Sequence, residues 1–299
     1  MHIPNEMLNG TICPVTAVVS ALGVGLAAFF AFRSKTKPQS AKFAAITALI
    51  FAGQMMNFPI NGGTSGHLLG GVLASSLLGI PFGVLSMALV VTIQCLVFAD
   101  GGFTVLGANI LNMAIIGAGL GGLIYAALNR NRDSVARVGI AAWCAVMLAA
   151  LVCSIELALS GTIGFFQVAG AMLSTHAFIG IGEALITVAV CAALRFEVTA
   201  VSQRRSVTVP LIASGIIATL LSPFASGLPD GLEWVAEKYS FLHESAPAFV
   251  SPLPDYTVSA ISNEMLATGL AGLIGVALTF LVAWLVAKGL TGLETVKTY

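Results

Sequence analysis

Long apolar stretches follow one another along most of the chain, separated by short polar or charged segments. A helix needs roughly 20 apolar residues to cross the hydrocarbon core of a membrane. On this basis we predict spans at about 13–32, 43–58, 67–79, 82–99, 105–128, 138–159, 170–194, 207–223 and 266–287. The third stretch is short, which indicates a tilted helix or one buried by its neighbours. The pattern predicts an all-α, polytopic transmembrane helical bundle of about nine spans.

The basic residues give this bundle an orientation. Nine crossings place twelve of the 13 Lys and Arg residues on one side of the membrane, and Lys238 alone on the other. Loops rich in Lys and Arg stay in the cytoplasm. We therefore expect a multi-pass protein of the cell (plasma) membrane, with its N-terminus outside and its C-terminus in the cytoplasm.

Composition narrows the class of protein. The chain is 58% hydrophobic and 9% charged, whereas soluble domains are about 25% charged. Its net charge is zero, so there is no electrostatic case for nucleic acid. It has neither a GxxxxGK[ST] phosphate loop nor an HExxH motif, so nothing indicates an ATPase or a zinc protease. The five cysteines form no CxxC pair, and the first twelve residues lack the positive charge of a signal peptide.

A charged stretch at 195–206 divides the chain. Residues 1–200 hold about seven of the predicted helices, and residues 201–299 hold a helical hairpin with an outer loop at about 224–264. This loop is acidic: it carries Asp230, Glu233, Glu237, Glu244, Asp255 and Glu264. Two interpretations stay open, a solvated loop and a functional one that raises the local cation concentration.

The chain begins Met1-His2, which places an α-amine, a backbone amide nitrogen and an imidazole next to one another. These three nitrogens can wrap one cation in two fused chelate rings. Planar nitrogen ligation favours Ni(II) or Cu(II). This site depends on a free α-amine at Met1.

A second histidine is expected on the same side of the membrane. His67 lies in a glycine-rich segment, 61–71, where an outer loop enters the third span. Its flanking glycines allow tight turns and close backbone approach. His67 can therefore supply a fourth nitrogen to a cation held by Met1 and His2, and Asn61 is a candidate for supporting this site.

Two further ionisable residues lie inside the seventh predicted span. His176 and Glu183 are seven residues apart, so they share a helix face. Such groups are expensive inside a membrane and usually functional. They can orient a metal ligand by hydrogen bonding, satisfy each other, or form the proton relay of an ion-coupled secondary permease.

Several motifs resemble the CbiM/NikM family, the substrate-binding membrane components of energy-coupling factor transporters for cobalt and nickel. The resemblance covers almost the whole chain and rests on Met1-His2-Ile3-Pro4, Gly63-Thr-Ser-Gly-His67-Leu-Leu-Gly-Gly71, Phe98-Ala-Asp-Gly-Gly-Phe103, Gly107-Ala-Asn109-Ile-Leu-Asn112-Met113 and His176-Ala-Phe-Ile-Gly-Ile-Gly-Glu183-Ala184. The segment Pro229-Asp-Gly-Leu-Glu233 resembles the PDGLE segment of the small CbiN/NikN subunit. The chain thus resembles a fusion of the two.

The resemblance implies that the amine and backbone of Met1-His2, the His2 ring and His67 hold the metal. It also implies partners, namely a transmembrane coupling subunit and cytoplasmic ATPases. We therefore expect a non-enzymatic component of an ATP-driven importer for Ni(II) or Co(II), with nickel slightly favoured. The cation would be the transported substrate, and no other cofactor is expected.

Two other functions are alternatives to this importer. A secondary permease using His176 and Glu183 would need no ATPase. An intramembrane metalloenzyme would use the metal to activate water, but a closed square of four nitrogens leaves no easy position for that water.

Overall fold

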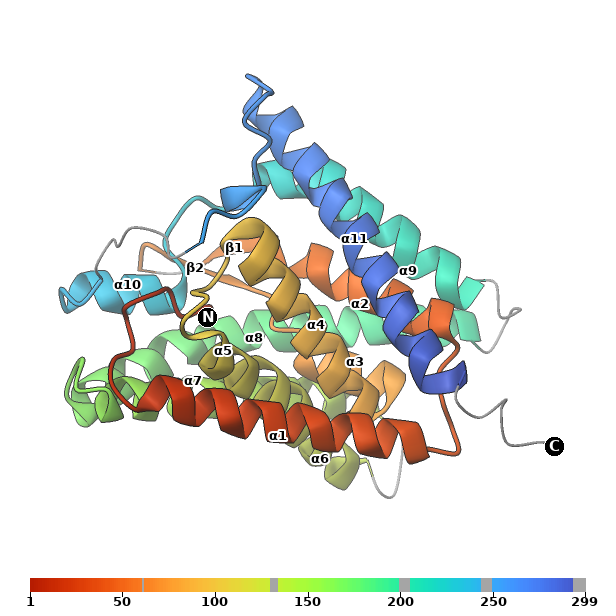
Figure 1. Cartoon of the computed structure of the whole chain (residues 1–299), viewed down its shortest axis with the longest axis horizontal. Helices are drawn as coiled ribbons and strands as arrows, with labels where there is room; N and C mark the ends of the chain where they lie inside the picture. The colour runs from red at the N-terminus through yellow and green to blue at the C-terminus, as the bar shows by residue number, and fades with distance from the viewer. Residues whose placement is uncertain (61, 130–133, 199–204, 243–248, 293–299) are drawn as a thin grey trace.

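The computed structural model describes the whole chain except residues 61, 130–133, 199–204, 243–248 and 293–299 (Figure 1). Its helices are α1 (Ile12–Arg33), α2 (Ser40–Gln54), α3 (Gly71–Leu78), α4 (Ile80–Phe98), α5 (Leu106–Ile110), α6 (Gly121–Leu128), α7 (Val135–Leu159), α8 (Phe165–Val198), α9 (Arg205–Ile216), α10 (Gly231–Lys238) and α11 (Glu264–Gly292). A π-helical stretch, η1 (Leu111–Leu120), joins α5 to α6, and η2 (Ile217–Leu221) and η3 (Ser222–Phe224) continue α9. A short 3-10 turn, η4 (Pro254–Tyr256), precedes α11. Strands β1 (Asn57–Ile60) and β2 (Thr64–His67) form an antiparallel hairpin.

The predicted all-α membrane bundle is confirmed. Among the described residues, seven helices are long and apolar enough to cross a membrane. Two of the predicted spans are shorter: α2 has 15 residues and α3 only 8. A helix of eight residues rises only about 12 Å, so α3 completes the third predicted span together with the buried loop that precedes it. Gly79, with φ of 86°, separates α3 from α4.

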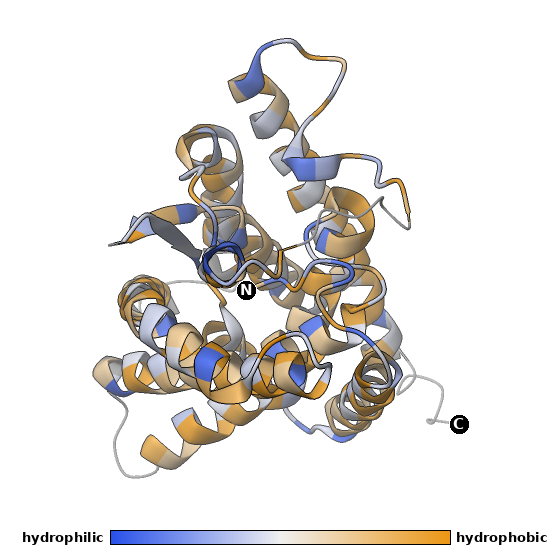
Figure 2. Ribbon diagram, turned by 90° about the vertical axis from the view of Figure 1, so that its left-hand side faces the viewer, coloured by the Kyte–Doolittle hydropathy of each residue, from blue (hydrophilic) through white to orange (hydrophobic). Residues whose placement is uncertain are grey.

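The outer faces of the helices are apolar, as a lipid environment requires. Helix α1 exposes Val18, Leu22, Leu26 and Phe30, which recur at a spacing of four. Figure 2 shows that the helices are mostly hydrophobic, with hydrophilic residues near the N-terminus, in other loops and at scattered helix positions. The protein is therefore a multi-pass membrane protein.

The C-terminal part of the chain packs closely on the rest. Helices α9 and α11 pack along α2, while α10 contacts α8 and β2. Figure 1 shows α10 beside the β hairpin and the N-terminus, at the end of the bundle where α1 begins and α2 ends. The fold thus brings the start of the chain, the hairpin and the predicted acidic loop to one place. Half of the charged stretch at 195–206, residues 199–204, lies outside the described residues, so the division at residue 200 stays a prediction.

Because the helices pack closely at Gly71, a larger residue there should lower the free energy of unfolding. A Cβ atom there would lie 2.5 Å from the Gly117 carbonyl carbon and 2.7 Å from the Ala118 nitrogen. Because these are backbone atoms, they cannot rotate away, and overpacking typically costs about 1–3 kcal/mol. We expect Gly71→Ala to lower the thermal unfolding temperature in detergent. Gly25→Ala, where a Cβ would meet nothing within 4 Å, is the matched control and should leave that temperature unchanged or slightly higher.

Candidate functional site

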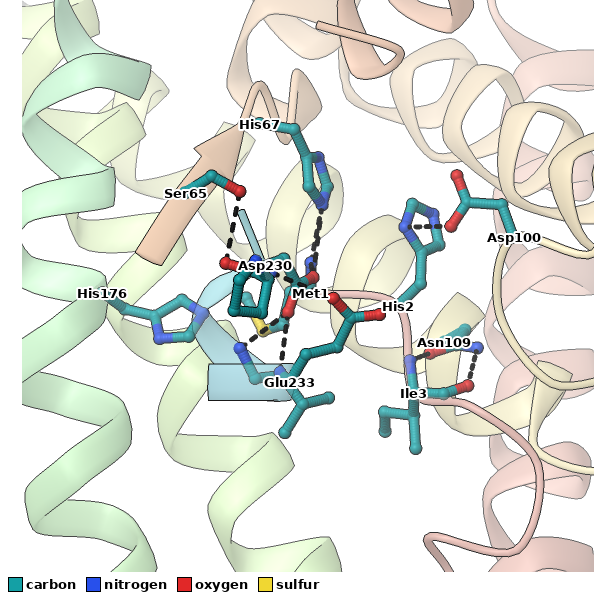
Figure 3. Close-up of polar contacts among 12 residues, drawn as sticks. Met1, His2, Ile3, Ser65, His67, Asp100, Asn109, His176, Asp230 and Glu233 are labelled. Carbon is teal, nitrogen blue, oxygen red and sulfur yellow. Dashed lines mark hydrogen bonds and ion pairs between the residues drawn. The ribbon is translucent and has the colours of Figure 1, made fainter. Parts of the chain in front are cut away.

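The first three residues lie inside the protein rather than on its surface. Met1 is 5% exposed, His2 is 7% exposed and Ile3 is fully buried. Asn109 holds this segment from α5: its Oδ1 accepts a hydrogen bond from the Ile3 N–H at 2.8 Å, and its Nδ2 donates to the Ile3 carbonyl at 3.1 Å (Figure 3). Gly102 donates a second hydrogen bond to the same carbonyl. These hydrogen bonds therefore hold the main chain of Met1-His2 in a fixed position inside the protein.

His67 is positioned by the β hairpin and by a carboxylate from α8. It is the last residue of β2 and pairs with Asn57 of β1. Beyond it, Glu183 accepts hydrogen bonds from the Leu69 N–H at 2.5 Å and the Gly70 N–H at 2.8 Å. Glu183 thus satisfies the backbone at the start of α3 and fixes the turn that carries His67.

The His67 ring presents a nitrogen lone pair to the α-amine. Its Nδ1 lies 3.0 Å from the Leu68 carbonyl oxygen, which can only accept, so Nδ1 carries the proton and Nε2 is left as a lone pair. Nε2 lies 2.6 Å from the Met1 amine nitrogen. With one ring nitrogen protonated, this imidazole is in the neutral form that binds metals.

The His2 ring stacks on His67, with centroids 5.2 Å apart and an interplanar angle of 18°. Its Nδ1 faces the Asp100 carboxylate at 3.0 Å, and its Nε2 lies 3.2 Å from the Gln94 side-chain oxygen. Asp100 also accepts a hydrogen bond from the Tyr256 hydroxyl at 2.6 Å. Burial raises the pKa of Asp100, but its pairing with His2 and Tyr256 outweighs this and brings the pKa well below its usual range. Asp100 is therefore an anion that directs the ring of His2.

A carboxylate from the C-terminal part of the chain completes the group. Asp230 Oδ2 lies 2.7 Å from the Met1 amine, across 229 positions of sequence. Burial raises the pKa of Asp230, but the Met1 ammonium outweighs this, and the pKa lies well below its usual range. In the described part of the chain, no three His, Cys, Asp or Glu side chains form a metal-holding cluster.

A polar cavity of about 710 Å³ leads to these residues. His2, His67, Asp100, Asp230 and Glu233 contribute to its lining, and it reaches the surface at the exposed Asp255. Its charged lining is acidic, which favours the entry of a cation over that of an anion.

The structure places the remaining sequence candidates as follows. His176 is 1% exposed, and its Nδ1 lies 2.8 Å from the Met172 carbonyl. His176 and Glu183 are not hydrogen-bonded to each other, because Glu183 binds the loop after His67. His176 lines a small cavity beside Met1 and His67. Asn61 lies outside the described residues.

Sequence reasoning missed three residues that shape this site. In the sequence, Asn109 and Asp100 stand out only as members of motifs shared with the family, and Asp230 only as one of six acids in the outer loop and as part of the PDGLE segment. A signal existed for Asp230, because its PDGLE segment is a capping-box sequence. Asp230 Oδ1 accepts from the N–H groups of Leu232 and Glu233, and the Glu233 side chain accepts from the Asp230 N–H. That signal predicts the start of α10 but not the partner of the second carboxylate oxygen.

The chain is similar to proteins of metal transport. Residues 2–201 match the family model "Cobalt uptake substrate-specific transmembrane region", CbiM, and residues 204–292 match the PDGLE domain. A protein of Archaeoglobus fulgidus named "Putative fused nickel transport protein NikMN" is 37% identical over 92% of this chain and 94% of its own length. The "Fused nickel transport protein NikMN" of Rhodobacter capsulatus is 28% identical over 93% of this chain and 94% of its own.

A solved structure agrees with these matches. The crystal structure of a truncated transition metal transporter superposes with a TM-score of 0.59 at 33% identity, covering 65% of this chain and 98% of its own. The family model alone covers more than half of the chain. The chain belongs to the CbiM family of metal-transport membrane proteins and carries a PDGLE domain on the same polypeptide.

Proposed function

We propose that this protein is the substrate-binding membrane component of an ATP-driven energy-coupling factor importer for Ni(II) or Co(II), with nickel slightly favoured. The observation that carries the proposal is the approach of the Met1 amine to His67 Nε2, at 2.6 Å in a buried pocket. With bonds of about 2.0 Å, two nitrogens at neighbouring corners of a square-planar metal lie about 2.8 Å apart. The two atoms are thus close to the spacing that one cation requires.

The other two nitrogens would come from His2. Its backbone nitrogen follows Met1 directly, and turning its ring away from Asp100 would bring Nδ1 into the same plane. The four donors would then be the Met1 amine, the His2 backbone and ring nitrogens, and His67 Nε2. Such a set favours Ni(II) among the family's cations, since planar nitrogen ligation suits it.

We place the site on the outer face of the membrane, with the N-terminus outside and the C-terminus in the cytoplasm. The cation would enter through the acidic cavity. ATP hydrolysis by partner subunits, together with a transmembrane coupling subunit, would drive its release inside. The secondary permease is the weaker alternative, because Glu183 holds the loop after His67 and makes no hydrogen bond to His176.

The proposed ligands predict the effect of removing each imidazole. His2→Ala and His67→Ala should each abolish high-affinity nickel uptake, because the four-nitrogen set loses a donor. Nickel uptake and the nickel content of the purified protein are the measurements. Asn9→Ala, on an exposed residue of the same N-terminal segment, is the control and should behave as wild type. Normal uptake by His67→Ala would contradict the proposed ligand set.

Asn109 should affect the affinity for Ni(II) although it is not a metal ligand. Asn109→Leu removes both hydrogen bonds to Ile3 and frees the Met1-His2 main chain to shift. Loss of a group that orients metal ligands typically costs about 10- to 100-fold in affinity. We expect a loss of this size in Ni(II) affinity, measured by competition with a chelator, in a protein that remains monodisperse in detergent. An unchanged affinity would show that the two hydrogen bonds between Asn109 and Ile3 do not set the ligand positions.

Blocking the α-amine should abolish binding without changing any residue. A short peptide fused before Met1 turns the amine into an amide, and the cavity beside it, of about 10 Å³, has room for about one water molecule. We expect the purified fusion to contain no nickel, while the same peptide fused after Tyr299 leaves the nickel content normal. If the N-terminal fusion still bound one Ni(II) with a yellow, low-spin spectrum, the amine would not be a ligand.

A further inference from the structure

The PDGLE segment brings an oxygen donor to the two nitrogens of the proposed site. Asp230 Oδ2 lies 2.7 Å from the Met1 amine nitrogen and 4.0 Å from His67 Nε2. The amine and His67 Nε2 are themselves 2.6 Å apart. Three potential ligand atoms therefore lie close together (Figure 3). They come from the start, the first quarter and the last quarter of the chain.

Backbone pairing fixes this carboxylate in place. The segment before α10 adds alongside β2, where the Ser65 N–H donates to the Pro229 carbonyl at 2.8 Å and Ser65 Oγ donates to the Leu228 carbonyl at 2.8 Å. The two oxygens of Asp230 then have separate tasks. Oδ1 caps α10 through Leu232 and Glu233, whereas Oδ2 faces the amine. The position of Oδ2 is thus set by the fold and not by the ion pair alone.

The spacing of the three atoms matches three corners of one metal. With bonds of about 2.0 Å, neighbouring corners of a square or octahedron are about 2.8 Å apart and opposite corners about 4.0 Å. The observed 2.6, 2.7 and 4.0 Å follow this pattern, with the amine in the middle and Asp230 opposite His67. In the proposed four-nitrogen square, the corner opposite His67 belongs to the His2 backbone nitrogen, the middle donor of the fused chelate. Asp230 Oδ2 therefore occupies the corner that this nitrogen would take.

We propose that Asp230 is a metal ligand in a first loading site, where the incoming cation is held by the Met1 amine, His67 Nε2 and Asp230 Oδ2. This inference rests on the proposed function, because it shares Met1 and His67 with the final site. The Met1 ammonium must release one proton to water in the cavity before its nitrogen can bind the cation in either site. The His2 backbone nitrogen must release a second proton before it can enter the four-nitrogen square, whereas the Asp230 carboxylate binds without losing a proton. The cation therefore binds Asp230 first and reaches the four-nitrogen square when the His2 nitrogen replaces the carboxylate.

His176, on helix α8, lies beside this loading site and offers it a hydrogen-bond acceptor. Its Nδ1 donates to the Met172 carbonyl, which leaves Nε2 as a lone pair. This buried Nε2 has no hydrogen-bond partner in the described part of the chain. It lines the small cavity shared with Met1, His67 and Asp230. An aquated cation held by three protein atoms keeps water ligands, and Nε2 can accept a hydrogen bond from one of them.

The two stages have different spectra, so Ni(II) itself is the probe. Ni(II) with three protein ligands and water is six-coordinate and high-spin, whereas the four-nitrogen square is low-spin and yellow. Asp230→Asn should slow the appearance of the yellow complex at least tenfold in stopped-flow absorption, with the same final spectrum and stoichiometry. Asparagine caps helices as well as aspartate does, so the variant keeps α10. Glu237→Gln, an exposed charge loss on the same helix, is the control and should load at the wild-type rate.

An equilibrium measurement isolates the loading site. His2→Ala removes a ligand of the final square only, so it should retain weak, colourless Ni(II) binding in equilibrium dialysis. Adding Asp230→Asn should weaken that binding at least tenfold. The ratio of wild-type to Asp230→Asn loading rates should persist at high salt, because ligation is not screened as long-range attraction is.

The outcomes separate this proposal from the function on which it rests. Wild-type loading by Asp230→Asn, or loss of its yellow complex at equilibrium, would overturn the loading site. A rate ratio that vanishes at high salt would also overturn it, since attraction alone would then explain the effect. If instead His67→Ala formed the yellow complex normally, the proposed ligand set itself would be wrong.

Discussion

The burial of the Met1 amine is the constraint on which the rest of the site depends. An amine with few water contacts is costly to leave unpaired, and here it lies between His67 Nε2 and the Asp230 carboxylate. Glu183 holds the turn that carries His67, and the pairing of Pro229 with Ser65 holds the segment that carries Asp230. Both interactions keep the two partners of the amine in place. The helical bundle supports the site, and a few hydrogen bonds to non-helical backbone set the positions of its side chains.

Irregular backbone inside a membrane protein needs its own partners. The loop between β2 and α3 is buried, yet its N–H groups at Leu69 and Gly70 are satisfied by Glu183. The Ile3 backbone is satisfied by Asn109 and Gly102. Ionisable and amide side chains within this bundle thus act first as substitutes for the hydrogen bonds that a helix would have supplied.

The sequence was sufficient for the class of fold and for the meeting of the N-terminus with the His67 loop. Apolar length and the count of crossings place Met1 and His67 on one side, and the structure brings them together. The same reasoning could not find Asp230 as their neighbour, because backbone pairing of Pro229 with Ser65 depends on tertiary structure. Nor could it show that the third predicted span is a buried loop and an eight-residue helix, because apolar composition does not distinguish a buried loop from a membrane helix.

Docking of the PDGLE segment on β2 is an intramolecular event in this protein, because both partners belong to one chain. Its effective concentration is therefore set by the tether, in the millimolar range for short flexible connections, and not by the amount of protein in the membrane. If the Asp230 contact opens, its opening and closing form a unimolecular equilibrium that dilution cannot shift. A version split into two polypeptides would make the same contact concentration-dependent, so the single chain makes the Asp230 contact independent of expression level.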